Sequence, residues 1–119
     1  MKIFFSLIFI TLFIDVYAET LYSSNIVKFR ALDRVTGRNY TFEAPLNSES
    51  IFGELIIIPK LCLKNPPEKT PESATYLIIN EIGNPLPIFE GWMFSSSPGL
   101  SALEHPVYDV WLLDCLIKD

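Results

Sequence analysis

The sequence predicts an all-β protein, a small antiparallel sandwich or barrel of about six strands with one short helix, tied by a disulfide. Short apolar runs alternate with turn-forming residues along the chain, and almost no stretch has the 3.6-residue periodicity of an amphipathic helix. The chain also has two cysteines, so Cys62 with Cys115 is the one disulfide possible within the monomer.

Residues 1–18 have the pattern of a cleaved signal peptide. Lys2 supplies the positive start, a run of about a dozen apolar residues follows, and Val16-Tyr17-Ala18 forms a small-x-small cleavage site. An uncleaved anchor is the alternative, but the run is shorter than the ~20 residues that span a bilayer. We expect a single β-rich domain over residues 19–119, exported and soluble, with no transmembrane span after cleavage.

Six runs of residues have the composition of strands. The first two, residues 26–32 and 39–44, alternate in polarity and are predicted to form a hairpin. The third, residues 54–63, contains Pro59, which predicts an edge strand or a bulge just before Cys62. The remaining runs cover residues 74–82, 86–94 and 107–117.

The last two runs carry further signals. Gly91 predicts a bulge or a close backbone approach, and Ser97 is suited to cap the short helix. The run at 107–117 is apolar on both faces, which predicts a central strand covered on both sides. Asp109 and Asp114 interrupt it, so each lies near a strand end or holds a cation or several hydrogen-bond donors.

The candidate binding residues gather near this end of the chain, which holds both tryptophans, the only histidine and three consecutive serines. Aromatic side chains around a Ser/Pro/Gly turn favour an exposed binding surface, because such residues dominate interface hot spots. The alternative is that they form the core of a small β protein. The residues are Trp92, Phe94, Ser95, Ser96, Ser97, Glu104, His105, Tyr108, Asp109 and Trp111.

A small hydrolase or transferase is the competing hypothesis, with His105 acting together with a serine of 95–97 or with Asp109. It predicts a serine hydroxyl about 3 Å from the histidine ring. No Gly-x-Ser-x-Gly motif is present, and a serine that caps a helix already has a role. We therefore favour a protein that is not an enzyme and assign no catalytic residue.

The composition argues against several other classes. The net charge is −5, and removal of residues 1–18 takes away one cation and one anion and leaves it unchanged, which disfavours nucleic acid. With one histidine and cysteines expected to be oxidised, we predict no metal site and no cofactor. A catalytic thiol is disfavoured because Cys115 lies in an apolar run, where a thiolate is unstable.

Several motifs resemble a known family: Phe-Glu-Gly-Trp-Met-Phe-Ser-Ser-Ser-Pro at residues 89–98, Leu-Glu-His-Pro-Val-Tyr-Asp-Val-Trp at 103–111, and Asp-Cys at 114–115. Two earlier pieces agree with them, Leu-Asp-Arg-Val-Thr-Gly at 32–37 and Phe-Gly-Glu-Leu at 52–55. The chain resembles an uncharacterised exported alphaproteobacterial family, domain-of-unknown-function family 2155. The resemblance implies a periplasmic setting and no particular activity. We expect a periplasmic module that binds a protein, an envelope polymer or a lipid.

Overall fold

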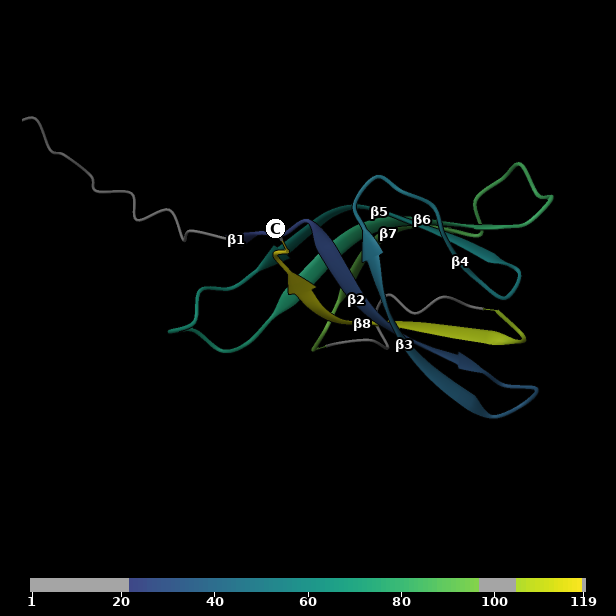
Figure 1. Cartoon of the computed structure of the whole chain (residues 1–119), viewed down its shortest axis with the longest axis horizontal. Coiled ribbons are helices and arrows are strands. Elements are labelled where there is room, and N and C mark those ends of the chain that lie inside the picture. The colour runs from purple at the N-terminus through teal and green to yellow at the C-terminus, as the bar shows by residue number, and fades with distance from the viewer. Residues whose placement is uncertain (1–21, 97–104, 119) are drawn as a thin grey trace, which may run out of the picture.

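The computed structural model describes residues 22–96 and 105–118, which form two antiparallel sheets (Figure 1). The five-stranded sheet has the order β1-β5-β6-β7, and β4 also pairs with β5. The three-stranded sheet has the order β3-β2-β8. The strands are β1 (Tyr22–Ser23), β2 (Ile26–Asp33), β3 (Arg38–Pro45), β4 (Ser50–Phe52), β5 (Leu55–Lys64), β6 (Ser73–Glu81), β7 (Phe89–Phe94) and β8 (Tyr108–Leu116).

The architecture confirms the all-β prediction and the disulfide, and it is a sandwich of two sheets. Each of the six predicted strands is present, and β2 and β3 form the predicted hairpin. The sequence did not predict the short strands β1 and β4. The signal peptide and the helix expected after Ser97 lie outside the described residues.

The core lies between the sheets and is built by alternation along each strand. Phe29 in β2, Ile57 in β5 and Leu77 in β6 are fully buried, and the residues on either side of each are more exposed. Burying one such side chain stabilises the fold by roughly 1.5–3 kcal/mol. The described residues contain no helix long and apolar enough to cross a membrane.

Two bulges change which side chains of β5 and β8 face the core. In β5, Pro59 pairs with Leu77 and Leu61 with Tyr76, so Lys60 has no partner on β6. The buried residues are therefore Leu55, Ile57 and Pro59 before the bulge and Cys62 after it, a shift from odd-numbered to even-numbered positions. The bulge predicted just before Cys62 is confirmed. The alternative of an edge strand is wrong, because β5 pairs with β6 on one side and with β1 and β4 on the other.

The bulge in β8 explains why this strand was wrongly predicted to be central. Phe29 pairs with Leu112 and Lys28 with Asp114, so Leu113 has no partner on β2. The buried side chains are Val110 and Leu112 before the bulge and Cys115 after it. When the strand is read with a fixed period of two, its sequence therefore looks apolar on both faces, although β8 is an edge strand of the three-stranded sheet.

The prediction for Gly91 is also wrong. Gly91 pairs with Leu77, and the β6–β7 register runs without a shift. A Cβ added at Gly91 would lie at an ordinary contact distance of 3.9 Å from the Phe89 ring.

Candidate functional site

A groove lined by aromatic side chains lies between β3 and β4, at the end of the sandwich where the β2–β3 hairpin and the β4–β5 turn both lie (Figure 1). Its volume is about 640 Å³, within the usual range for ligand-binding clefts. Four aromatic residues line it, and Asp33, Ile51 and Glu43 add two carboxylates and an exposed aliphatic group. The aromatic residues are Tyr40, Phe42, Phe52 and Tyr108.

The aromatic rings of the groove form a continuous contact network. Phe52 stacks on Phe42 with centroids 5.9 Å apart, and it meets Tyr40 and Tyr108 edge to face at 5.4 and 5.5 Å. Such pairs contribute about 0.5–1.5 kcal/mol beyond the burial of their area. Tyr40 remains 43% exposed, so the groove presents an aromatic face to solvent.

Gly53 fixes the position of Tyr108 at the floor of this groove. A Cβ added at Gly53 would lie 2.5 Å from the Tyr108 hydroxyl oxygen, and the backbone there has a φ of +57°. Glycine is therefore required twice, for space and for the left-handed conformation. The β4–β5 turn can lie against the tyrosine only because this residue has no side chain.

His105 is held by structural contacts on both sides of its ring. Its Nδ1 accepts hydrogen bonds from the backbone N–H groups of Val107 at 3.1 Å and Tyr108 at 3.2 Å. Its Nε2 lies 2.6 Å from Oε1 of Glu81, and its ring stacks on Tyr108 with centroids 5.3 Å apart. Because Nδ1 accepts, the ring proton is on Nε2 and faces the carboxylate. The histidine thus links the start of β8 to β6.

Asp109 binds a cation, as the sequence predicted for a carboxylate in this run that does not simply lie near a strand end. Arg34 donates from Nε to Oδ2 at 3.1 Å and from Nη2 to Oδ1, a bidentate pair, and its Nη1 donates to the backbone oxygen of His105 at 3.0 Å. The Asp109 side chain is 19% exposed and that of Arg34 46%. This pair fastens the turn after β2 to the start of β8.

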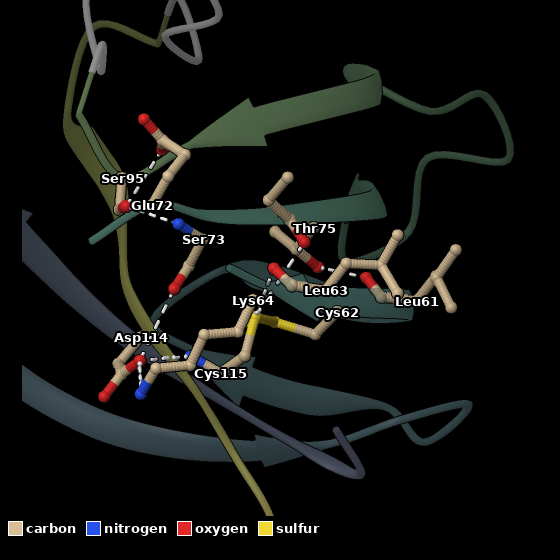
Figure 2. The surroundings of a disulfide bond; sticks show 11 residues. Leu61, Cys62, Leu63, Lys64, Glu72, Ser73, Thr75, Ser95, Asp114 and Cys115 are labelled. Carbon is tan, nitrogen blue, oxygen red and sulfur yellow. Dashed lines mark hydrogen bonds and ion pairs between the residues drawn. A yellow bond between two sulfur atoms is a disulfide. The ribbon is translucent and has the colours of Figure 1, made fainter. Parts of the chain in front are cut away.

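Ser95 and Ser96 bind Glu72 at the far end of β7. The Ser95 hydroxyl donates to Oε1 of Glu72 at 3.1 Å and accepts from the Ser73 N–H at 2.9 Å (Figure 2). The Ser96 N–H donates to Oε1 of Glu72 at 3.2 Å, and the Ser96 hydroxyl donates to Oε2. Burial alone would raise the pKa of Glu72, but the hydrogen bonds from Ser96, Ser95 and Ser73 outweigh it and lower that pKa from 4.5.

Asp114 connects the two sheets beside the disulfide. It lies 3.0 Å from the Lys64 ammonium and accepts from the Ser73 hydroxyl at 3.4 Å and the Cys115 N–H at 2.8 Å (Figure 2). The cation and the donors expected for this carboxylate are therefore both present. Cys62 and Cys115 lie next to this network, with Cα atoms 5.7 Å apart.

The predicted aromatic residues do not form one surface. Trp92 and Phe94 are 38% and 39% exposed on β7, on the face opposite the buried Met93. Trp111 is half-buried beside Arg30, in a separate depression of the three-stranded sheet. Of the predicted aromatic residues only Tyr108 lines the aromatic groove. Ser97 and Glu104 lie outside the described residues.

Sequence reasoning missed most of the aromatic groove. Alternation does place Tyr40 and Phe42 on one face of a strand, and this signal could have found two of its residues. Phe52 and Gly53 gave no such signal, because they lie at a turn whose contact with Tyr108 spans more than fifty residues of sequence. Among the described residues, no group of three or more metal-ligating side chains is close enough together to hold an ion.

Fold and site together define a small two-sheet β protein, tied by a disulfide at one end and carrying an aromatic groove at the other. The chain belongs to the family described as "Uncharacterized protein conserved in bacteria (DUF2155)", whose model matches residues 27–115. It is similar to the uncharacterized protein RP359 of Rickettsia prowazekii (strain Madrid E), at 29% identity over 104 residues, which cover 85% of this chain and 67% of that protein. No solved structure matches the chain. The family resemblance seen in the sequence is confirmed.

Proposed function

We propose that this protein is a non-catalytic binding module of the periplasm whose ligand occupies the aromatic groove. The observation that carries the proposal is the set of aromatic rings that line an open groove of about 640 Å³. Aromatic side chains with a polar rim are the usual composition of a binding site, because large apolar area is combined with groups that fix orientation. Tyr40, Phe52 and Tyr108 are the residues expected to contact the ligand.

The environment of His105 supports binding over catalysis. Both of its ring nitrogens have partners, Glu81 on one side and two backbone N–H groups on the other. The hydrolase hypothesis needs a serine hydroxyl at the ring, whereas the hydroxyls of Ser95 and Ser96 bind Glu72. A general base would have to leave these contacts before it could accept a proton from a nucleophile.

Two features support export. Residues 1–18 have the sequence pattern of a signal peptide, and a structural disulfide is favoured in an oxidising compartment. The protein's ligand is therefore sought outside the cytoplasm, among peptides, envelope polymers and lipids.

Binding would be tested with the purified protein against three probes in parallel: a library of linear peptides, a glycan array, and vesicles of phosphatidylethanolamine and phosphatidylglycerol. We compare the wild type with a Tyr40→Ala/Phe52→Ala variant and with Trp92→Ala as a control, since Trp92 is as exposed as Tyr40 but lies on β7. Binding of one probe that falls at least tenfold in the double variant and less than twofold in the control supports the proposal. No selective binding, or equal binding by all three proteins, overturns it.

A further inference from the structure

We propose that the occupant of the aromatic groove is an extended peptide that adds as a strand to the free edge of β3. This inference rests on the proposed function and deepens it, because it specifies the ligand class and how the ligand binds. It is carried by the backbone that borders the groove, an observation separate from the aromatic side chains.

The groove runs along two strand edges that have no partner in the described sheets. β3 ends the order β3-β2-β8, and β4 pairs with β5 alone. Four consecutive residues of β3, residues 40–43, and all three of β4 line the groove. Because successive side chains of a strand point to opposite faces, a lining of consecutive residues means that the backbone edge itself borders the groove.

A free strand edge presents a row of unpaired N–H and C=O groups, which another strand can satisfy. An added peptide gains affinity from main-chain hydrogen bonds and specificity from pockets that receive alternate side chains. Four residues of β3 span about 10 Å, so the recognised core would be about four peptide residues. A glycan or a lipid chain would leave the row of amide donors only partly satisfied.

The side chains around the edge indicate the sequence of the peptide. Tyr40 and Phe42 lie on the same face of β3 as the buried Ala44, so this face opens onto Phe52 and Tyr108. Alternate residues of the peptide would contact these rings and should be aromatic or aliphatic. The charged residues that line the groove are Asp33 and Glu43, whose carboxylates already bind the Val35 and Thr36 N–H groups and the Lys118 ammonium, so we expect the peptide to be recognised through its apolar side chains and its backbone.

A second copy of this chain is disfavoured as the occupant because each copy has a net charge of −5, so two copies repel each other.

The test has two measurements on the wild-type protein, with the peptide selected from a linear library as probe. In the first, each peptide amide is N-methylated in turn. Loss of about tenfold in affinity at every second position, and less than about threefold at the positions between, is expected for a strand that bonds through one edge. In the second, amide exchange is followed by NMR, and the outward amides of residues 40–43 should slow at least tenfold when peptide is bound. The edge of β7 serves as the internal control and should not change.

The outcomes separate this inference from the proposed function. If a glycan or the vesicles bind in a groove-dependent way and no peptide binds, the proposed function as a binding module stands and the inference that the ligand is a peptide is overturned. Peptide binding with protection on β7, or without the alternating N-methyl pattern, also overturns strand addition at β3. Slowed exchange of residues 40–43 that grows with protein concentration in the absence of peptide would identify a second copy as the occupant and overturn the inference.

Discussion

Cys62 and Cys115 are bonded to each other, and each lies two residues beyond an unpaired residue that shifts the register of its strand, Lys60 in β5 and Leu113 in β8. Without these bulges, the period of two along a strand would turn both sulfurs away from the core. The disulfide between the sheets therefore depends on two local irregularities of backbone pairing.

Deletion of Leu113 should prevent the disulfide. The deletion restores regular alternation in β8 and turns Cys115 toward solvent. We expect free thiols at both cysteines, measured by mass after alkylation of the unreduced protein. Deletion of the exposed Lys118, which lies beyond β8, is the control and should leave both cysteines bonded. A disulfide that persists in the Leu113 deletion would contradict this account of the bulge.

Removal of the disulfide should destabilise the fold by about 4 kcal/mol, because the bond closes a loop with a sequence separation of 53 residues. The Cys62→Ala/Cys115→Ala variant is compared with the wild type by urea denaturation. The wild type in reductant should approach the variant, while the variant itself should not respond to reductant. A difference below about 1 kcal/mol would show that the sheets are held mainly by their core.

Gly53→Ala should destabilise the protein more than Gly37→Ala. Both glycines have positive φ, +57° and +73°, so both substitutions carry the cost of about 1–2 kcal/mol for a left-handed residue. Only at Gly53 does the new methyl group meet Tyr108, whereas nothing lies within 4 Å at Gly37. The additional destabilisation by Gly53→Ala should disappear in a Tyr108→Ala background, where the ring is absent. Equal free energies of unfolding for the two single variants would contradict the predicted close contact.

The Arg34–Asp109 pair should contribute about 1 kcal/mol, measured as the coupling in a double-mutant cycle of Arg34→Ala and Asp109→Ala. The value is modest because the Arg34 side chain is 46% exposed and solvent screens the interaction. The coupling should fall as salt is raised from about 0.05 to about 1 M. A coupling near zero would contradict a stabilising ion pair, and the cost of Arg34→Ala alone would then come from its bond with the His105 backbone.

Glu72 should make the fold sensitive to acid. Its pKa is lower in the folded protein than in the unfolded chain, so its ionised form contributes stability fully above the unfolded value near 4.5. This contribution is lost as the pH falls through the lower folded value. Glu72→Gln should therefore lose less stability than the wild type between about pH 5 and about pH 3. Glu68→Gln, an exposed glutamate of the same loop, is the control and should follow the wild type.

Much of the fold was predictable because it is determined locally. The β2–β3 hairpin follows from alternation around a turn, and the sequence near Asp114 indicated that a carboxylate in this run needs a cation or hydrogen-bond donors, both of which are present. The central position predicted for β8 was wrong because a bulge is fixed by the partner strand, and a partner's register cannot be read from one run of residues. The aromatic groove was missed for a related reason, since Phe52 and Tyr108 meet only after the two sheets pack.

β5 and β8 each carry the disulfide near their last residues and meet the aromatic groove near their first. At the groove end the link from β8 to the five-stranded sheet is noncovalent and includes the contact of His105 with Glu81. The two sheets are therefore joined covalently at one end only. Under mechanical load or in dilute denaturant we expect the sheets to separate first at the groove and to stay joined at the disulfide, so that a ligand bound in the groove would stabilise the end that opens more easily.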